Sequence, residues 1–169
     1  MNTPLLPAVV VAAVDASVDA DPTIAAHIVD VAAAWAESFG ARLVIVTACP
    51  PPPIPSFGPL DPANVALITM RTLLDSAVRH ADELMLQLAE RARQRGVATT
   101  TSTITEPGRL PDLIADAALA EVGDATRGLL VLATRGRKGL AVKLLGSVAE
   151  RTAHVSQLPV LLLPPPPEG

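Results

Sequence analysis

A connection rich in glycine and basic residues carries the clearest chemical signal in the chain. It runs from Ala133 to Ser147 (ATRGRKGLAVKLLGS) and contains four basic residues and no acidic one. A phosphate group needs a main chain free of bulky side chains, and the unpaired N–H groups at a helix start attract an anion. Gly136, Gly139 and Gly146 supply such a main chain, and Ser147 adds a hydroxyl donor. This pattern predicts a site for a di- or triphosphate.

The basic residues of this connection stand out because the chain has a net charge of −4. They are Arg135, Arg137, Lys138 and Lys143. An alternative stays open, because Ser147 and Glu150 have the spacing of a capping box. In that arrangement the Ser147 hydroxyl accepts from the Glu150 N–H, and the helix start is already occupied.

Asp15 is a second candidate, since it directly follows the apolar run Ala8–Val14 (AVVVAAV). In an open α/β sheet, ligands bind outside the carboxyl ends of the strands, where the strand order reverses. If the first strand lies beside the fourth, Asp15 faces the glycine-rich connection. Its carboxylate could then accept from ribose hydroxyls or join a metal shell. The alternative role is an Asx turn with Ser17.

The elements that must position these residues alternate between strands and helices. Four runs are almost continuously apolar, which is typical of strands covered on both faces, and a fifth is β-branched but polar, which favours an exposed edge strand. In chain order the five runs are Ala8–Val14, Arg42–Ala48, Ala98–Thr105, Leu129–Leu132 and Val160–Leu163.

Helical patterns fill the intervals between these runs. Asp21 and Pro22 can start the first helix and Gly40 can end it. The others are predicted at about 62–95, at about 111–122, and from 147 to before 159. The apolar stripes on the first two helices comprise Ile24, Ile28, Val31, Trp35 and Phe39, and Leu67, Leu74, Val78, Ala81, Met85 and Leu88. The alternation implies right-handed crossovers and a parallel sheet with helices on both faces. We predict one α/β domain over residues 1–163 and a proline-rich tail over 164–169.

Composition argues against several functional classes. The negative net charge disfavours general binding to nucleic acid or to an anionic membrane, and the chain has no Tyr, one Trp and two Phe for base stacking. Cys49 is the only cysteine, so no intrachain disulfide can form. The apolar stretch 5–14 lacks the basic flank of a signal peptide and is too short to span a bilayer. We expect a cytoplasmic protein with no nucleic-acid or membrane partner.

Standard catalytic motifs are missing from the sequence. There is no GxxxxGK[ST], and no GxGxxG follows the first strand. His27, His80 and His154 fall on separate predicted helices, and no His, Cys and Asp cluster has the spacing of metal ligands. We therefore predict no catalytic or metal-ligating residue and, at most, slow hydrolysis of the bound di- or triphosphate.

The segment TRGRKGLAVKLLGSVAER, followed by LPVLLLP, resembles the signature of the universal stress protein family. The ATP-binding branch of that family carries G-x2-G-x9-G-[ST] after its fourth strand. Gly136 followed by nine residues and Gly146-Ser147 matches the later part of the motif, and Ala133 replaces its first glycine. The segments 11–17 (VAAVDAS) and 106–118 (EPGRLPDLIADAA) also resemble family segments.

The resemblance implies a five-stranded parallel sheet of order 3-2-1-4-5, a homodimer formed through the last strand, and bound ATP with a divalent cation such as Mg²⁺. It also implies roles for individual residues. Near the ribose and the base would lie Ala13, Val14, Asp15 and Ala48; around the phosphates would lie Leu132, Ala133, Arg135, Gly136, Gly146, Ser147 and Val148.

Two functions follow from the resemblance. The first is a stress-response sensor or regulator that binds ATP. The second is a nucleotide-free dimeric interaction module acting through its dimer surface or the loop Pro50–Pro62. Ala133 supports the second, because a methyl group costs on the order of 1 kcal/mol where positive φ is needed. Gly128 is a further departure, since the family usually has Asp or a small polar residue there.

Overall fold

Five parallel strands form one sheet in the order β3-β2-β1-β4-β5. The computed structural model describes residues 6–51, 63–134 and 146–166, and the side chains of 63–67 are not described. The strands are β1 (Val9–Ala13), β2 (Arg42–Ala48), β3 (Thr99–Ile104), β4 (Gly128–Ala133) and β5 (Val160–Leu163). The predicted sheet order is confirmed.

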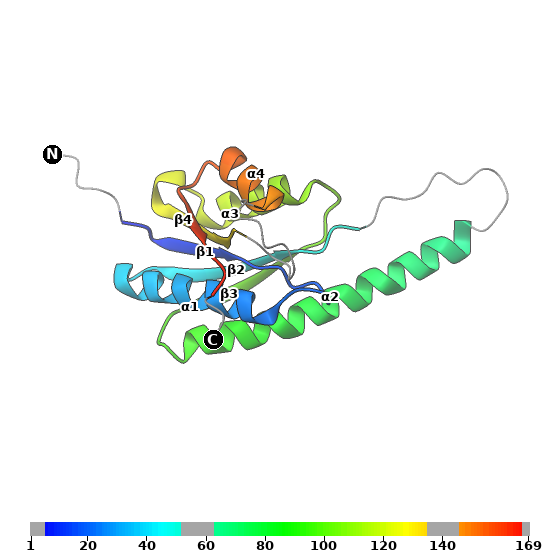
Figure 1. The fold of residues 1–169 in the computed structure, drawn as a ribbon, viewed down its shortest axis with the longest axis horizontal. Coiled ribbons are helices and arrows are strands. Elements are labelled where there is room, and N and C mark those ends of the chain that lie inside the picture. The colour runs from blue at the N-terminus through cyan, green and yellow to red at the C-terminus, as the bar shows by residue number, and fades with distance from the viewer. Residues whose placement is uncertain (1–5, 52–62, 135–145, 167–169) are drawn as a thin grey trace.

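Helices cover both faces of this sheet (Figure 1). One face carries α1 (Pro22–Phe39) and α2 (Ala63–Arg93), and the other carries α3 (Leu110–Val122) and α4 (Ser147–Val155). Side chains alternate along each strand, so Val10 and Ala12 enter the α1–α2 core, whereas Val11 and Ala13 enter the α3–α4 core. A short 3-10 helix, Ala125–Arg127, precedes β4.

The two edge strands differ in polarity. In β3, Thr100 and Thr101 are exposed, as the polar sequence of this strand predicted. In β5, by contrast, Val160, Leu161 and Leu162 are only half-buried. The sheet therefore has one polar edge and one apolar edge.

The first helix begins and ends where its sequence predicted. Asp21 accepts a hydrogen bond from the Thr23 N–H at 3.0 Å, Pro22 is the first helical residue, and Gly40 ends the helix with φ of 63°. Of the predicted stripe, Ile24 and Ile28 are buried as expected. The rest of the buried face differs, because small alanines pack closest to the sheet: Ala25, Ala32, Ala33 and Ala36. Trp35 is left 41% exposed at the flank.

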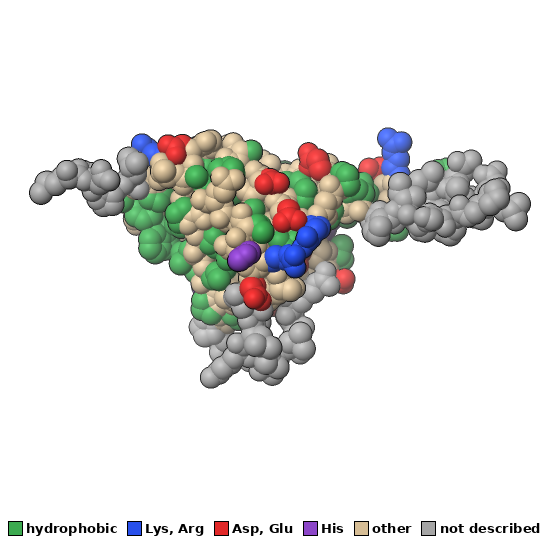
Figure 2. Space-filling view, turned by 90° about the horizontal axis from the view of Figure 1, so that it is seen from above, with side chains coloured by type: hydrophobic (Ala, Val, Ile, Leu, Met, Phe, Trp, Pro, Cys, Tyr) green, Lys and Arg blue, Asp and Glu red, His purple; other side chains and the backbone are tan. Residues whose placement is uncertain are grey.

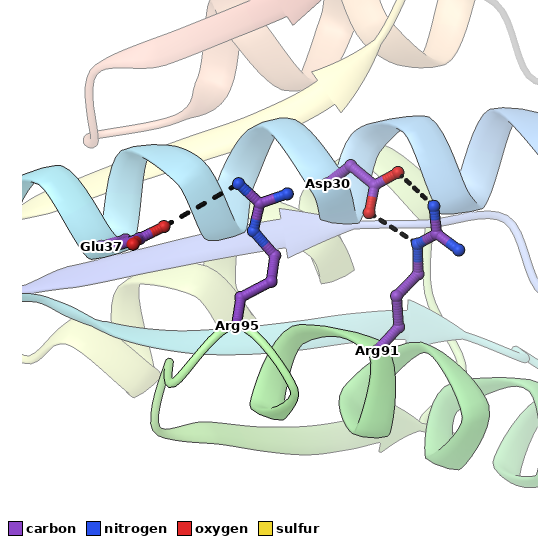
Figure 3. Close-up of polar contacts among 4 residues, drawn as sticks. All are labelled: Asp30, Glu37, Arg91 and Arg95. Carbon is purple, nitrogen blue, oxygen red and sulfur yellow. Dashed lines mark hydrogen bonds and ion pairs between the residues drawn. The ribbon is translucent and has the colours of Figure 1, made fainter.

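The second helix is attached to the domain by its C-terminal half only. Arg91 of α2 pairs with Asp30 of α1 through two contacts of 2.6 and 2.7 Å, and Arg95, in the turn that follows α2, lies 3.8 Å from Glu37 of α1 (Figure 3). Burial along the predicted stripe begins at Ala81 and continues through Met85, Leu88, Ala89 and Ala92. Leu74 and Val78 are half-buried, and Leu67 lies outside the described side chains. The N-terminal half of α2 extends beyond the sheet (Figure 1).

Gly128 is required by packing at the start of β4. It is buried, and a Cβ atom there would lie 2.8 Å from both γ-carbons of Val122 and 2.9 Å from Leu158 Cδ2. Distances under 3.0 Å force the neighbours to move, and Val122 has a branched, stiff side chain. A larger residue is thus excluded by the contact between α3, β4 and the segment before β5.

Replacing Gly128 by alanine should lower the free energy of unfolding. Overpacking a buried site typically destabilises by about 1 to 3 kcal/mol, and this exceeds the gain from reduced chain entropy in the unfolded state. Urea unfolding followed by circular dichroism measures the change. Gly108→Ala is the matched control, because its Cβ would meet only the flexible end of Leu113. Equal stability of Gly128→Ala and the wild type would contradict this packing account.

Candidate nucleotide site

The candidate site lies at the carboxyl edge of β1 and β4. Ala13 pairs with Leu132, so Asp15 and Thr134 both lie two residues beyond a paired position of adjacent strands. Ala13 and Leu132 belong to the core on the α3–α4 face. Side chains two residues apart on a strand point to the same face, so those of Asp15 and Thr134 point to the face that carries α4.

Asp15 is exposed, and one of its oxygens is engaged locally. Oδ1 accepts a hydrogen bond from the Ser17 N–H at 3.0 Å, which forms the Asx turn given above as the alternative role. This turn holds the carboxylate in place at the sheet edge. A carboxylate oxygen has a second lone pair and a second oxygen, so the turn leaves acceptor capacity toward a ligand.

The start of α4 has no side-chain cap. Gly146 is the N-cap residue, and its carbonyl accepts from the Glu150 N–H at 3.0 Å. Ser147 is the first helical residue and is exposed, so the capping box considered for Ser147 and Glu150 does not form. The physical reason is register, because Gly146 rather than Ser147 is the N-cap residue and the Glu150 N–H already donates to the Gly146 carbonyl. Among the described residues, no side chain caps this helix start.

Both ends of the glycine-rich connection are tied to the sheet. The Thr134 N–H donates to the Leu163 carbonyl at 2.7 Å, and the Thr134 carbonyl accepts from the Gly146 N–H at 2.7 Å. The second bond brings the start of α4 to the end of β4. Residues 135–145, which include the candidates Arg135 and Gly136, lie outside the described residues.

We call the carboxyl edge of β1 and β4, beside the start of α4, the crevice. Ala133 points its methyl group away from it. It packs with the core on the α1 face, opposite to α4, and is half-buried. No described non-glycine residue has positive φ, so Ala133 is in an ordinary strand conformation. The positive φ that would make the methyl group unfavourable is therefore not required at this position.

The remaining candidate residues differ in how deeply they are buried and in which face of the sheet they occupy. Ala48 is half-buried at the end of β2, and Val148 is half-buried against the α3–α4 core. Val14 is buried in the opposite core, and its N–H donates to the Val46 carbonyl at 3.0 Å. Only the main chain of Val14 can therefore contact a ligand on the α3–α4 side.

A group of polar residues around Cys49 was not found from the sequence. Thr103 Oγ1 donates to Asp82 Oδ1 at 2.7 Å, which joins β3 to α2. Cys49, at the end of β2, is half-buried nearby, and burial followed by the carboxylates of Asp82 and Asp15 raises the pKa of its thiol. Asp82 lies within a long helix, so no sequence motif links it to the strand ends.

The described surface around the crevice has mixed charge. Figure 2, seen from the side of α3 and α4, shows carboxylates spread among a few basic side chains. At the N-cap of α3, Arg109 has its Nε 3.6 Å from Asp112 Oδ2, and no side chain caps this helix either. Two helix starts without side-chain caps thus lie on the same face of the sheet.

This arrangement defines an open parallel α/β domain in which a helix start without a side-chain cap lies where the strand order reverses. The chain belongs to the universal stress protein family, whose model matches residues 8–164. No curated protein matches the chain in sequence. Among the described helices, none is both long enough and apolar enough to cross a membrane.

Solved structures share this fold. The universal stress protein UspA from Lactobacillus plantarum is 19% identical with a TM-score of 0.70, and the match covers 96% of this chain and 99% of that one. The universal stress protein from Archaeoglobus fulgidus in complex with dAMP is 20% identical with a TM-score of 0.59, covering 95% and 98%. A universal stress protein in complex with cAMP is 24% identical with a TM-score of 0.52, covering 94% and 97%.

The Cys49 thiol should titrate above its usual pKa of 9.0. Because the thiolate is the reacting form, the rate of alkylation by iodoacetamide should rise with pH to a midpoint above that value. Asp82→Asn should lower the midpoint, because it removes one of the charges that disfavour the thiolate. Cys49 is the only cysteine, so the reaction reports this site alone.

Asp75→Asn, on an exposed turn of the same helix, is the control and should leave the midpoint unchanged. A midpoint that does not move in Asp82→Asn would show that Asp82 does not act on Cys49 in solution.

Proposed function

We propose that the protein binds ATP at the carboxyl edge of β1 and β4 and acts as a cytoplasmic stress-response sensor or regulator. The observation that supports this most directly is the start of α4, where Gly146 is the N-cap and no side chain of the described residues caps the amides. Membership of the universal stress protein family supports it as well. Two similar structures are complexes with dAMP and cAMP, which are adenine nucleotides.

In this proposal the phosphates bind at the start of α4. The amides of Ser147 and Val148 point along the helix axis toward the anion, and the helix dipole adds attraction. Gly136 and Arg135, from the connection, would supply close main-chain approach and positive charge. Ala133 offers no steric opposition, because its methyl group packs on the α1 face.

The nucleoside would occupy the opposite end of the same crevice. The acceptor capacity left on Asp15 suits a ribose hydroxyl or an exocyclic amine. Ala13, Ala48 and Leu132 would form the apolar wall against the base, and Val14 would contribute main-chain atoms. The negative charge of Asp15 and Asp82 and the positive charge of the connection would then orient the nucleotide in one direction.

In this proposal the phosphates of ATP, and not a cluster of protein side chains, hold the divalent cation. In the part of the chain that the structure describes, no three His, Cys, Asp or Glu side chains gather into a metal-binding group. We assign the protein a regulatory role rather than efficient hydrolysis, because none of the described residues of the proposed phosphate site has a side chain that can act as a base for water.

Gly146→Asp should abolish ATP binding while stabilising the protein. Gly146 has φ of −64° and ψ of 143°, so an L-residue fits there, and aspartate is among the best N-cap residues. The new cap should gain a few tenths of a kcal/mol, whereas its carboxylate occupies the amides and repels the phosphates. Calorimetric titration with Mg-ATP should show an affinity loss of about tenfold or more, alongside an unchanged or higher unfolding midpoint.

Gly146→Ala is the control, since alanine brings neither a cap nor a charge and should retain binding. Wild-type affinity in Gly146→Asp would exclude the start of α4 as the phosphate site. Folded wild-type protein that shows no saturable ATP binding would instead favour the nucleotide-free interaction module.

We also infer that β5 pairs with β5 of a second copy. Apolar side chains flank this open edge on both faces of the sheet. On one face lie Val31, Trp35, Phe39 and Leu161, and on the other lie Val155, Val160 and Leu162. An exposed apolar edge strand is an association site unless it is covered, and a second copy of the same strand provides matching hydrogen bonds.

Leu162→Pro should convert the dimer to a monomer. Leu130 N–H donates to the Pro159 carbonyl and Thr134 N–H to the Leu163 carbonyl, so the intervening main chain of Leu162 faces away from β4. Proline removes an outward N–H without breaking the β4–β5 ladder. Sedimentation equilibrium should show the mass halved, and emission of Trp35 should shift to the red.

Leu162→Ala removes the same side-chain contacts but keeps the N–H, so it should remain dimeric. Loss of the dimer in both variants would assign the contact to side chains, and loss in neither would exclude the β5 edge.

A further inference from the structure

The N-terminal half of α2 presents a helix surface from which no described side chain enters the buried core. We call residues 68–80 the arm. It extends past the sheet in Figure 1, and every one of its side chains is exposed or half-buried. The helix becomes buried only from Ala81 onward. The arm is thus a helix held at one end, by the ion pairs of Arg91 and Arg95 with α1.

Apolar residues continue along the arm in the same line as the buried stripe. Met70, Leu74, Ala77 and Val78 are half-buried and recur at spacings of three and four. Leu73 beside them is 63% exposed. Spacings of this kind give a seam for packing against another helix, and a surface helix with no neighbour does not need them.

Charges of alternating sign run beside this seam. Arg71, Asp75 and Arg79 follow one another at intervals of four, so they lie on one flank of the helix. Within the described chain none of the three forms an ion pair. Because the signs of these charges alternate, the flank can place opposite charges against the same flank of an antiparallel second copy that is shifted by one helical turn.

We propose that the arm pairs antiparallel with the arm of a second copy of this chain. A register that places Met70 against Leu74 of the second copy has a two-fold axis near residues 72–73. The same register brings Arg71 close to Asp75 of the second copy, and Asp75 close to its Arg71. Apolar packing and charge pairing are thus satisfied by one arrangement. A parallel pair would instead place like charges level with each other.

The contact is short, because thirteen residues of helix span about 20 Å, or roughly two heptads. Its strength should therefore depend on protein concentration. It is separate from β5, since α2 covers the β2–β3 side of the sheet. The pairing of the two arms can therefore be tested separately from the nucleotide site and from the β5 pair.

Disulfide trapping tests the register. In a full-length Cys49→Ala, Leu162→Pro background, Leu73→Cys should form a covalent dimer when a copper-phenanthroline oxidant is added. Ser76→Cys is the control on the side of the helix away from the seam and should stay largely monomeric. Equal cross-linking of the two variants, or none in Leu73→Cys, overturns the proposed pairing.

Charge reversal tests the partner. In the Leu162→Pro background, Arg71→Asp alone and Asp75→Arg alone should each weaken self-association about tenfold in sedimentation equilibrium, and the double exchange should restore it. Circular dichroism checks that α2 stays helical. If the Leu162→Pro protein is monomeric up to millimolar concentration, the proposal is overturned. The arm would then bind another segment of the chain or a different protein. Failure of the double exchange to restore association overturns it also.

Discussion

The parallel register between β1 and β4 is the constraint on which the candidate site depends. Because Ala13 pairs with Leu132, the chain leaves both strands at the same level, with Asp15 on one side and Thr134 on the other. Thr134 is then bonded to Leu163 through its N–H and to Gly146 through its carbonyl. The start of α4 is fixed to the sheet edge by these main-chain bonds, independently of the side chains in the connection. A one-residue shift in register would move Asp15 to the other face.

The starts of α1, α3 and α4 differ between the two faces of the sheet in whether a side chain caps them. On the α1 side, Asp21 satisfies the start of α1 with its own side chain. On the other face, α3 and α4 begin at Arg109 and Gly146 without a side-chain cap. Glycine at an N-cap costs only a few tenths of a kcal/mol relative to the preferred residues. Glycine at the N-cap of α4 therefore costs the domain little stability although it provides no side-chain cap.

Local patterns predicted the elements well, whereas contacts between distant segments stayed beyond reach. The caps of α1 follow from Asp21, Pro22 and Gly40 alone, and the polar edge strand follows from its threonines. The strand order came from the family resemblance, because periodicity does not say which strands are neighbours. The orientation of Ala133, the exposure of Trp35 and the proximity of Asp82 to Cys49 each depend on packing between separate elements. The meaning of Gly128 likewise required the positions of Val122 and Leu158.

The topology also relates the arm to the crevice. In a parallel sheet, each helix that follows a strand begins at the carboxyl edge, so α2 and α4 start on the same side of the domain. Asp82, just after the arm, bonds to Thr103 and contributes to the field around Cys49, which Asp15 shares. A partner held by the arm would therefore approach the carboxyl edge of the sheet near β2 and β3, whereas a partner held by β5 would lie at the opposite lateral edge.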